Sequence, residues 1–191
     1  AMREVVVAVI TPALDCGAIA DRTKCGGWCA FVLIWVTVVY FPVANWVFGS
    51  GWILNKLRAE DFAGGTAVHI NAGAAALALC LVLGKRVGWR RDPMKPHNVT
   101  FTMVGAALLW VGWFGFNAGS NLEANSGAAL AFINTLLATA AAVLSGLIVE
   151  AITKGKLSML GGGSGAVAGL AGGTRACVTV GPMGRLGSGW V

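Results

Sequence analysis

Charged residues are scarce in this sequence, and their scarcity excludes an ordinary soluble domain. Asp, Glu, Lys and Arg make up 12% of the 191 residues, whereas a typical soluble domain carries about 25%. Hydrophobic residues make up 57%, and the mean hydropathy is +0.74. We therefore expect an integral membrane protein.

Clusters of metal ligands and phosphate-binding motifs are also missing. The five cysteines are scattered, and the two that lie four residues apart, Cys25 and Cys29, have no further ligand beside them, whereas a structural zinc site takes about four ligands. No Gly-Lys-Ser/Thr run occurs, so a phosphate-binding loop is not expected. No basic segment precedes the first apolar run, so we expect no cleavable signal sequence. The sequence thus implies no metal and no cofactor.

The net charge of +6 comes mostly from short loops between apolar runs. If successive loops alternate sides, one side holds only Lys56 and Arg58. The other side holds nine basic residues: Arg22, Lys24, Lys85, Arg86, Arg90, Arg91, Lys95, Lys154 and Lys156. Short loops rich in Lys and Arg stay in the cytoplasm. The charges therefore predict a multi-pass protein of the cell membrane with its N-terminus on the outer side, and they do not indicate a nucleic-acid partner.

The apolar runs predict five or six helical spans, because about 20 apolar residues cross a bilayer as a helix. The expected spans are Val5–Ala20, Gly27–Val47, Phe62–Gly84, Val99–Ser120 and Gly127–Ile152, with a Gly-rich sixth at Leu160–Gly173. Together they predict an all-α integral membrane protein, a multi-span helical bundle that forms a single transmembrane domain over residues 1–191.

Local residue types predict how these helices begin and bend. Asp61 before the third span and Ser126 at the fifth are expected to cap free N–H groups. Pro12 and Pro42 lie inside spans, so they predict kinks or broken hydrogen-bond ladders.

Small and polar residues predict how the helices pack. Gly115–Gly119 and Gly165–Gly169 each have a Gly-x-x-x-Gly spacing, which favours close contact between helices in a membrane. Asn117 and Asn134 are polar residues inside spans, so we expect their amides to join neighbouring helices.

His69 is the most informative residue of the chain. It is the only histidine in the 23-residue run Phe62–Gly84, which contains no Asp, Glu, Lys or Arg. At about 1.5 Å per residue, it lies roughly 10 Å inside the run. An ionisable side chain at such a depth is costly and therefore marks a candidate functional site. The alternative is a neutral histidine that hydrogen-bonds between helices.

Two segments resemble the signature of the ammonium transporter (Amt/Mep/Rh) family, Asp61–Asn71 (DFAGGTAVHIN) and Trp113–Ser120 (WFGFNAGS). Further similar stretches follow the family's order: Ile10–Ala13, Tyr40–Ala44, Lys95–Asn98 and Ser164–Leu170. The resemblance covers nearly the whole chain but only the middle of the family's protein. The sequence is therefore expected to be a fragment of a longer protein or a degenerate copy.

The resemblance implies a helical pore in each subunit of a homotrimer that takes up ammonium. An outer site recruits the cation, a proton is lost, and ammonia passes two stacked histidines in an apolar pore. His69 matches the first of these histidines, and nothing in this chain matches the second, because His97 matches a loop of the family. The family also implies a cytoplasmic signalling protein of the nitrogen-regulatory type as a partner.

Five other residues take roles from the resemblance. Phe48 and Ser120 match the outer site, where an aromatic face attracts a cation and a hydroxyl accepts from N–H. Phe116 matches an aromatic gate, and Trp113 an aromatic side chain packed near it. Asp61 is expected to act electrostatically or as a helix cap. Simple packing remains an alternative for Phe116, as does a bond to a backbone carbonyl for Ser120.

Several positions depart from the family's pattern. Val7, which follows Glu4 by three residues, occupies the position that matches the family's outer aromatic gate. Phe48 occupies a position where the family has Trp. Arg175 replaces a proline. Asp15 places a carboxylate in the first span, where it needs a partner or a proton.

Two other functions would also use some of these residues. A membrane protein that senses ammonium without transporting it, or that associates with a transporter, would keep the binding residues. A fused soluble regulatory domain would favour a sensor, and we expect none within these 191 residues. An intramembrane serine protease would use Ser164 in a Gly-x-Ser-Gly pattern, yet its base must lie within hydrogen-bond reach. No histidine follows Ser164, so we do not expect an enzyme.

Overall fold

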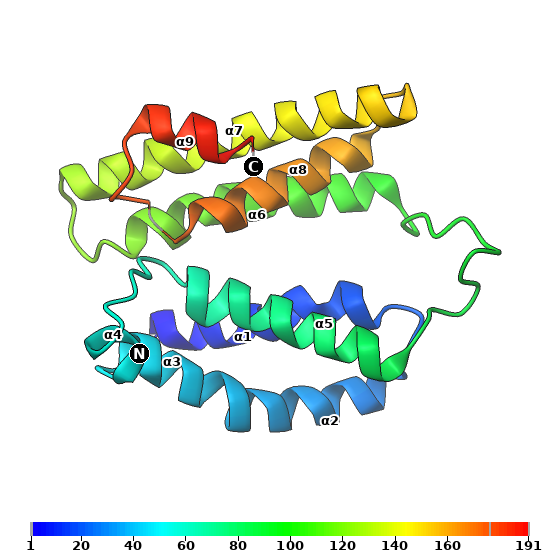
Figure 1. Ribbon diagram of the computed structural model, residues 1–191, viewed down its shortest axis with the longest axis horizontal. Helices are drawn as coiled ribbons and strands as arrows, with labels where there is room; N and C mark the ends of the chain where they lie inside the picture. Colours follow the sequence, from blue (N-terminus) through cyan, green and yellow to red (C-terminus); the bar gives the residue numbers. More distant parts are fainter. Residues whose placement is uncertain (1, 176, 191) are drawn as a thin grey trace. The chain divides into compact units, whose positions relative to one another are not determined.

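The computed structural model describes residues 2–175 and 177–190, and its regular structure is helical throughout this part of the chain (Figure 1). The all-α prediction is therefore confirmed. Packing divides the chain into two compact units, Ala1–Lys95 and Pro96–Val191, which we describe separately.

The first unit contains α-helices and two π-helical segments, in which the chain is wound more loosely. They are α1 (Met2–Ile19), α2 (Cys25–Trp35), η1 (Val36–Tyr40), α3 (Phe41–Phe48), α4 (Trp52–Asn55), η2 (Gly65–Ile70) and α5 (Asn71–Leu83). Helix α1 packs against both α5 and η2, and α3 also contacts η2. The predicted second and third spans each contain a π segment, which periodicity alone did not indicate.

The two prolines have different surroundings. Pro12 lies inside α1, which continues through it as one helix. Pro42 lies in the first turn of α3, directly after η1. Proline has no N–H to donate and its ring crowds the carbonyl four residues earlier, so a π turn at this point accommodates the break in the hydrogen-bond ladder.

The second unit contains α6 (Val99–Gly119), α7 (Ser126–Lys154), α8 (Met159–Gly173) and the short α9 (Pro182–Ser188). Helices α7 and α8 run side by side (Figure 1). A Cβ atom added to Gly165 would lie 2.8 Å from the Ala142 carbonyl oxygen, and one on Gly169 would lie 2.6 Å from the Ala142 Cβ. The predicted close contact at Gly165–Gly169 is confirmed.

The same spacing has a different outcome on α6. A Cβ atom on Gly115 or Gly119 would meet no described atom within 4 Å beyond its chain neighbours and the nearby backbone of its own helix. Within the described part of the chain, no second helix comes close to Gly115 or Gly119. A Gly-x-x-x-Gly spacing allows close packing but needs a neighbouring helix at that face.

The polar residues within the spans of this unit do join its elements. Asn117 Nδ2 donates to Thr135 Oγ1 at 2.9 Å, which ties α6 to α7. Asn134 Nδ2 donates to the carbonyl oxygens of Cys177 at 2.7 Å and Val180 at 2.8 Å. Asn117 therefore joins two helices as predicted, whereas Asn134 joins α7 to the turn that precedes α9 and not to a neighbouring helix.

The cap of α7 differs from the prediction by one residue. Asn125, not Ser126, accepts the free donors, since its Oδ1 receives the N–H of Gly127 at 2.8 Å and of Ala128 at 3.3 Å. The Asn125 backbone is extended, as a capping residue requires, whereas Ser126 is already helical.

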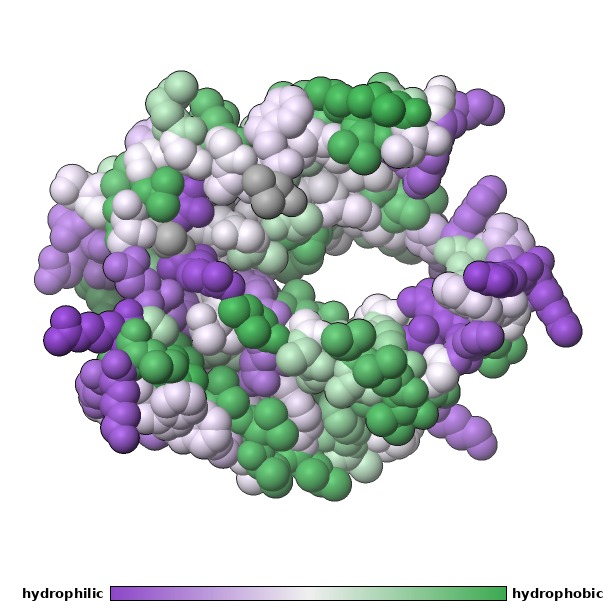
Figure 2. All heavy atoms as spheres, viewed as in Figure 1, coloured by the Kyte–Doolittle hydropathy of each residue, from purple (hydrophilic) through white to green (hydrophobic). Residues whose placement is uncertain are grey.

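Four helical segments of the described chain are long and apolar enough to cross a membrane: Cys25–Asn55, Gly65–Leu83, Val99–Gly119 and Ser126–Lys154. Five or six were expected. Helix α1 carries Glu4 and Asp15, and α8 is only 15 residues long. Large apolar side chains are exposed on these segments, for example along α2 (Figure 2). Such a surface suits contact with lipid, in keeping with a multi-pass membrane protein.

Candidate functional site

The Asp61 carboxylate organises the start of the segment that carries His69. Its Oδ1 accepts the N–H of Gly64 at 2.7 Å, and its Oδ2 accepts those of Thr66 at 2.8 Å and Ala67 at 2.9 Å. Amide groups at the beginning of a helix have no partner within the helix. A single side chain therefore satisfies three donors at the entry to η2.

Gly64 lets the chain turn into this segment. Its φ of 110° lies in a region that side chains disfavour. Its carbonyl oxygen accepts from Val68 N at 2.9 Å and from His69 N at 3.1 Å. The second of these bonds spans five residues, as in a π turn, and π turns often occur at functional sites. The backbone conformation of His69 thus depends on Gly64.

The surroundings of His69 are mostly apolar. Ala67 and Val68, which precede it, are fully buried, and the His69 ring is half-buried. The Asp61 carboxylate is close enough to interact electrostatically with the ring. The geometry therefore places an imidazole in an apolar span with a carboxylate nearby, where it can exchange a hydrogen bond or a proton.

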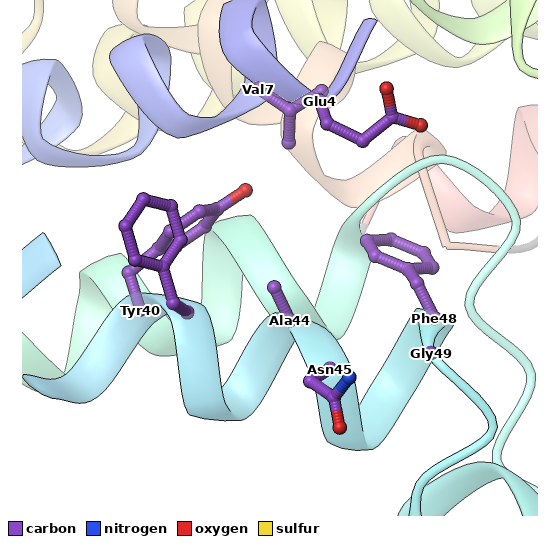
Figure 3. Close-up of a pocket in the computed structure, with 8 residues that line it drawn as sticks. Glu4, Val7, Tyr40, Ala44, Asn45, Phe48 and Gly49 are labelled. Atoms are coloured by element: carbon purple, nitrogen blue, oxygen red, sulfur yellow. The ribbon is translucent and has the colours of Figure 1, made fainter. Parts of the chain in front are cut away.

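Phe48 lines a pocket of about 500 Å³ within the first unit (Figure 3). Val7, the residue at the expected outer gate, lines the same pocket and is 8% exposed, whereas Phe48 is 39% exposed. The structure therefore brings together the two positions that the family resemblance implies for the outer site and its gate.

Three further polar residues line this pocket, namely Glu4, Tyr40 and Asn45. The sequence had marked Glu4 only as a departure from the family pattern. Tyr40 was missed, although Tyr40, Ala44 and Phe48 repeat every four residues, which puts them on one helical face. That spacing was the available signal.

The remaining candidates are Trp113 and Phe116 in α6 and Ser120, the residue that caps the C-terminal end of this helix. The rings of Trp113 and Phe116 have centroids 5.3 Å apart at an angle of 44°. Trp113 is 2% exposed, and its Nε1 donates to Thr174 Oγ1 at 2.9 Å. This bond fixes the aromatic pair against the end of α8.

The Ser120 hydroxyl donates to the Phe116 carbonyl oxygen at 2.8 Å. This is the bond to a backbone carbonyl that the sequence offered as the alternative to a binding role for Ser120. A hydroxyl oxygen has two lone pairs, so Ser120 can still accept a hydrogen bond from a ligand while it makes this contact.

Other predicted features belong to neither group. Asp15 is fully buried in α1, and neither of its carboxylate oxygens has a hydrogen-bond partner within residues 2–175 and 177–190. His97 lies in the loop before α6. Over the same described residues, no group of three or more His, Cys, Asp or Glu side chains could hold a metal ion.

Comparison with known proteins gives consistent matches. The sequence model described as Ammonium Transporter Family matches residues 1–191. The ammonium transporter of Mycobacterium tuberculosis (strain ATCC 25618 / H37Rv) is 54% identical over 194 residues, covering 97% of this chain and 41% of that protein. That of Bacillus subtilis (strain 168) is 48% identical over 169 residues, covering 88% and 41%.

Solved structures are similar over the same extent. The crystal structure of Candida albicans Mep2 has a TM-score of 0.88 and 40% identity, covering 97% of this chain and 42% of that one. A structure described as "Sensor Amt Protein" has a TM-score of 0.88 and 30% identity, covering 98% and 49%. The chain thus spans about two fifths of the length of the curated relatives it matches.

Proposed function

Since this chain belongs to the ammonium transporter family, we propose that it passes ammonium or ammonia across the cell membrane, with its N-terminus on the outer side. The observation that carries the proposal is the π segment that Asp61 caps and that holds His69 inside an apolar span. The family is one of transporters and not of enzymes, so the serine-protease alternative at Ser164 is discarded.

The pore residues would act on two properties of ammonium. Ammonium donates hydrogen bonds and can lose a proton, whereas potassium can do neither. Phe48 offers an aromatic face to a cation, and Ser120 offers a hydroxyl acceptor. Phe116, braced by Trp113, would serve as the aromatic gate.

His69 would act on the neutral molecule. An apolar wall penalises an ion by several kcal/mol but tolerates neutral ammonia. A ring nitrogen of His69 can accept from ammonia or donate to it, and can carry the proton that ammonium releases. Asp61 would support this role by holding the backbone of η2 and by its charge.

Assembly is a further part of the proposal. We infer that the chain forms a homotrimer within the lipid bilayer and acts as a single transmembrane domain. A cytoplasmic signalling protein of the nitrogen-regulatory type is the partner that the family resemblance suggests. These inferences rest on that resemblance.

The alternative is a membrane protein that senses ammonium or associates with a transporter. The similarity to the structure described as "Sensor Amt Protein" favours it. Such a protein would bind ammonium without flux.

The test is ammonium-driven flux into proteoliposomes that contain the purified chain, compared with empty liposomes. His69→Ala is expected to abolish saturable flux. His97→Ala is the matched control, because it removes the same side chain from a loop outside the spans, and it is expected to retain flux. Flux that is unchanged in His69→Ala would contradict the assigned role. Binding of ammonium without any flux would support the sensing alternative.

A further inference from the structure

Two exposed thiols lie on one face of the chain at the start of α2. Cys25 is the first residue of this helix, and Cys29 follows one turn later. Both are free cysteines with exposed side chains. Residues four apart in a helix stand one above the other on the same face, and the two thiols are close enough to interact directly. The helix therefore presents them as a pair.

The surroundings leave this pair open to a ligand. A Cβ atom added to Gly26 or Gly27 would meet no described atom within 4 Å beyond its chain neighbours and the nearby backbone of its own helix. The preceding loop carries Arg22 and Lys24, and the side of the membrane that is rich in such residues is expected to be cytoplasmic. Thiols in the cytoplasm are kept reduced, so a ligand arriving there would meet two free thiols.

The helical spacing is unfavourable for a disulfide bond between these two cysteines. Cβ atoms of helix residues four apart lie about 5–6 Å from each other, whereas a disulfide needs about 3.5–4.5 Å. Closing the bond would therefore unwind the first turn of α2. An atom that bridges the two sulfurs relaxes this limit, because bonds of about 2.3 Å, the length of a Zn–S bond, hold the sulfurs about 3.5–4 Å apart. The pair thus suits a bridging atom better than a direct bond.

The number of available ligands decides which atom can form the bridge. Structural zinc takes about four protein ligands, and the described part of the chain has no group of three or more His, Cys, Asp or Glu side chains that could hold a metal ion. Arsenic in its trivalent state forms three bonds, so two thiolates and one substituent of its own complete it. Thiolates are soft ligands that select soft partners. The pair therefore suits trivalent arsenic.

We propose that Cys25 and Cys29 form a binding site for trivalent arsenicals. With phenylarsine oxide, each thiol gives up its proton and forms an S–As bond, and the oxygen of the arsenical leaves with the two protons as one molecule of water. Arsenic stays trivalent, so no oxidant or reductant takes part. The second S–As bond forms within one molecule, which raises the affinity about 100-fold or more above that of a single thiol. This inference goes beyond the proposed function and does not depend on it.

The experiment adds phenylarsine oxide to the reduced chain in nanodiscs and follows the adduct by intact-protein mass spectrometry while the monothiol 2-mercaptoethanol is titrated in. The wild type is expected to hold one phenylarsenic group per chain. In Cys25→Ser and in Cys29→Ser, half of the arsenical should be displaced at a monothiol concentration about 100-fold lower than in the wild type. Cys16→Ser removes an exposed cysteine of α1 and is expected to match the wild type.

A further variant keeps both thiols but moves one of them to another face of the helix. Cys29→Ser combined with Ala30→Cys places an exposed thiol five residues from Cys25, and residues at this spacing do not share a face. It should lose the arsenical as easily as the single variants, and because these positions are exposed, the substitutions should leave folding intact. Retention as strong as in the wild type by this variant or by Cys29→Ser would overturn the inference. An equal loss in Cys16→Ser and Cys29→Ser would also overturn it.

Discussion

The substitution Asp61→Ala is expected to be strongly destabilising although the residue lies in a loop. It removes the acceptor of three backbone N–H groups, those of Gly64, Thr66 and Ala67. Gly64 directly precedes η2, and Thr66 and Ala67 lie in its first turn, which receives no side-chain cap from Gly64. The first turn of η2 would then have to find water or fray.

The magnitude follows from the number of bonds. A hydrogen bond to a charged group contributes about 1.5–3 kcal/mol to stability, and an ordinary helix cap contributes about 1 kcal/mol. Because Asp61 is only half-buried, water can replace part of the loss, and about 1–1.5 kcal/mol per bond is appropriate. The three bonds together predict a loss of about 3–4.5 kcal/mol. Asp61→Asn keeps one acceptor oxygen, so we expect a loss of about 1–3 kcal/mol.

The assay is reversible unfolding in mixed micelles of dodecylmaltoside and SDS, followed by circular dichroism. Glu60→Ala is the matched control, since it removes the neighbouring carboxylate at an exposed position and should change stability by less than about 0.5 kcal/mol. The reasoning fails if Asp61→Ala unfolds at the same SDS fraction as Glu60→Ala.

Three further predictions concern packing, capping and reactivity. Gly169→Ala would place a methyl carbon 2.6 Å from a carbon atom of α7 and should cost about 1–3 kcal/mol in the same unfolding assay. A methyl group at Gly115 would meet no described atom of another helix within 4 Å, so Gly115→Ala should be neutral or slightly stabilising; equal effects would contradict the packing. Asn125→Ala should cost about 1 kcal/mol through the lost cap, and Ser126→Ala should cost much less; the reverse order would refute the observed boundary of α7. Burial raises the pKa of the Cys177 thiol to about 11, so at pH 8 only about one thiol in a thousand is ionised, and maleimide should label Cys177 far more slowly than an exposed cysteine. Labelling at the rate of an exposed cysteine would show that Cys177 is accessible.

The positions of the long helices were predictable, because apolar runs in this chain end at polar loops. The third span was expected at Phe62–Gly84, and the structure has helix from Gly65 to Leu83. The cap of α7 was misplaced because Asn125 and Ser126 both suit capping, and only the extended backbone of Asn125 decides between them. The residue types therefore predicted the helix but not the residue that caps its N-terminus.

The π segments and the pocket could not be predicted from local pattern. The π turn at His69 depends on the bond from its amide to the Gly64 carbonyl, which the spacing of apolar residues does not reveal. The pocket requires α1 to face η1 and α3, so the role of Tyr40 emerged only from packing. The resemblance to the family placed His69, Phe116 and Ser120 on spans, and their functional roles remain proposals.

The measurement that tests the central claim most directly compares ammonium and potassium flux through the same proteoliposomes. A path that selects for hydrogen-bond donation and proton loss, with His69 in an apolar span, should carry ammonium above the rate of empty liposomes and leave potassium at that background rate. Potassium flux as fast as that of ammonium, or no ammonium flux above background, would contradict the claim.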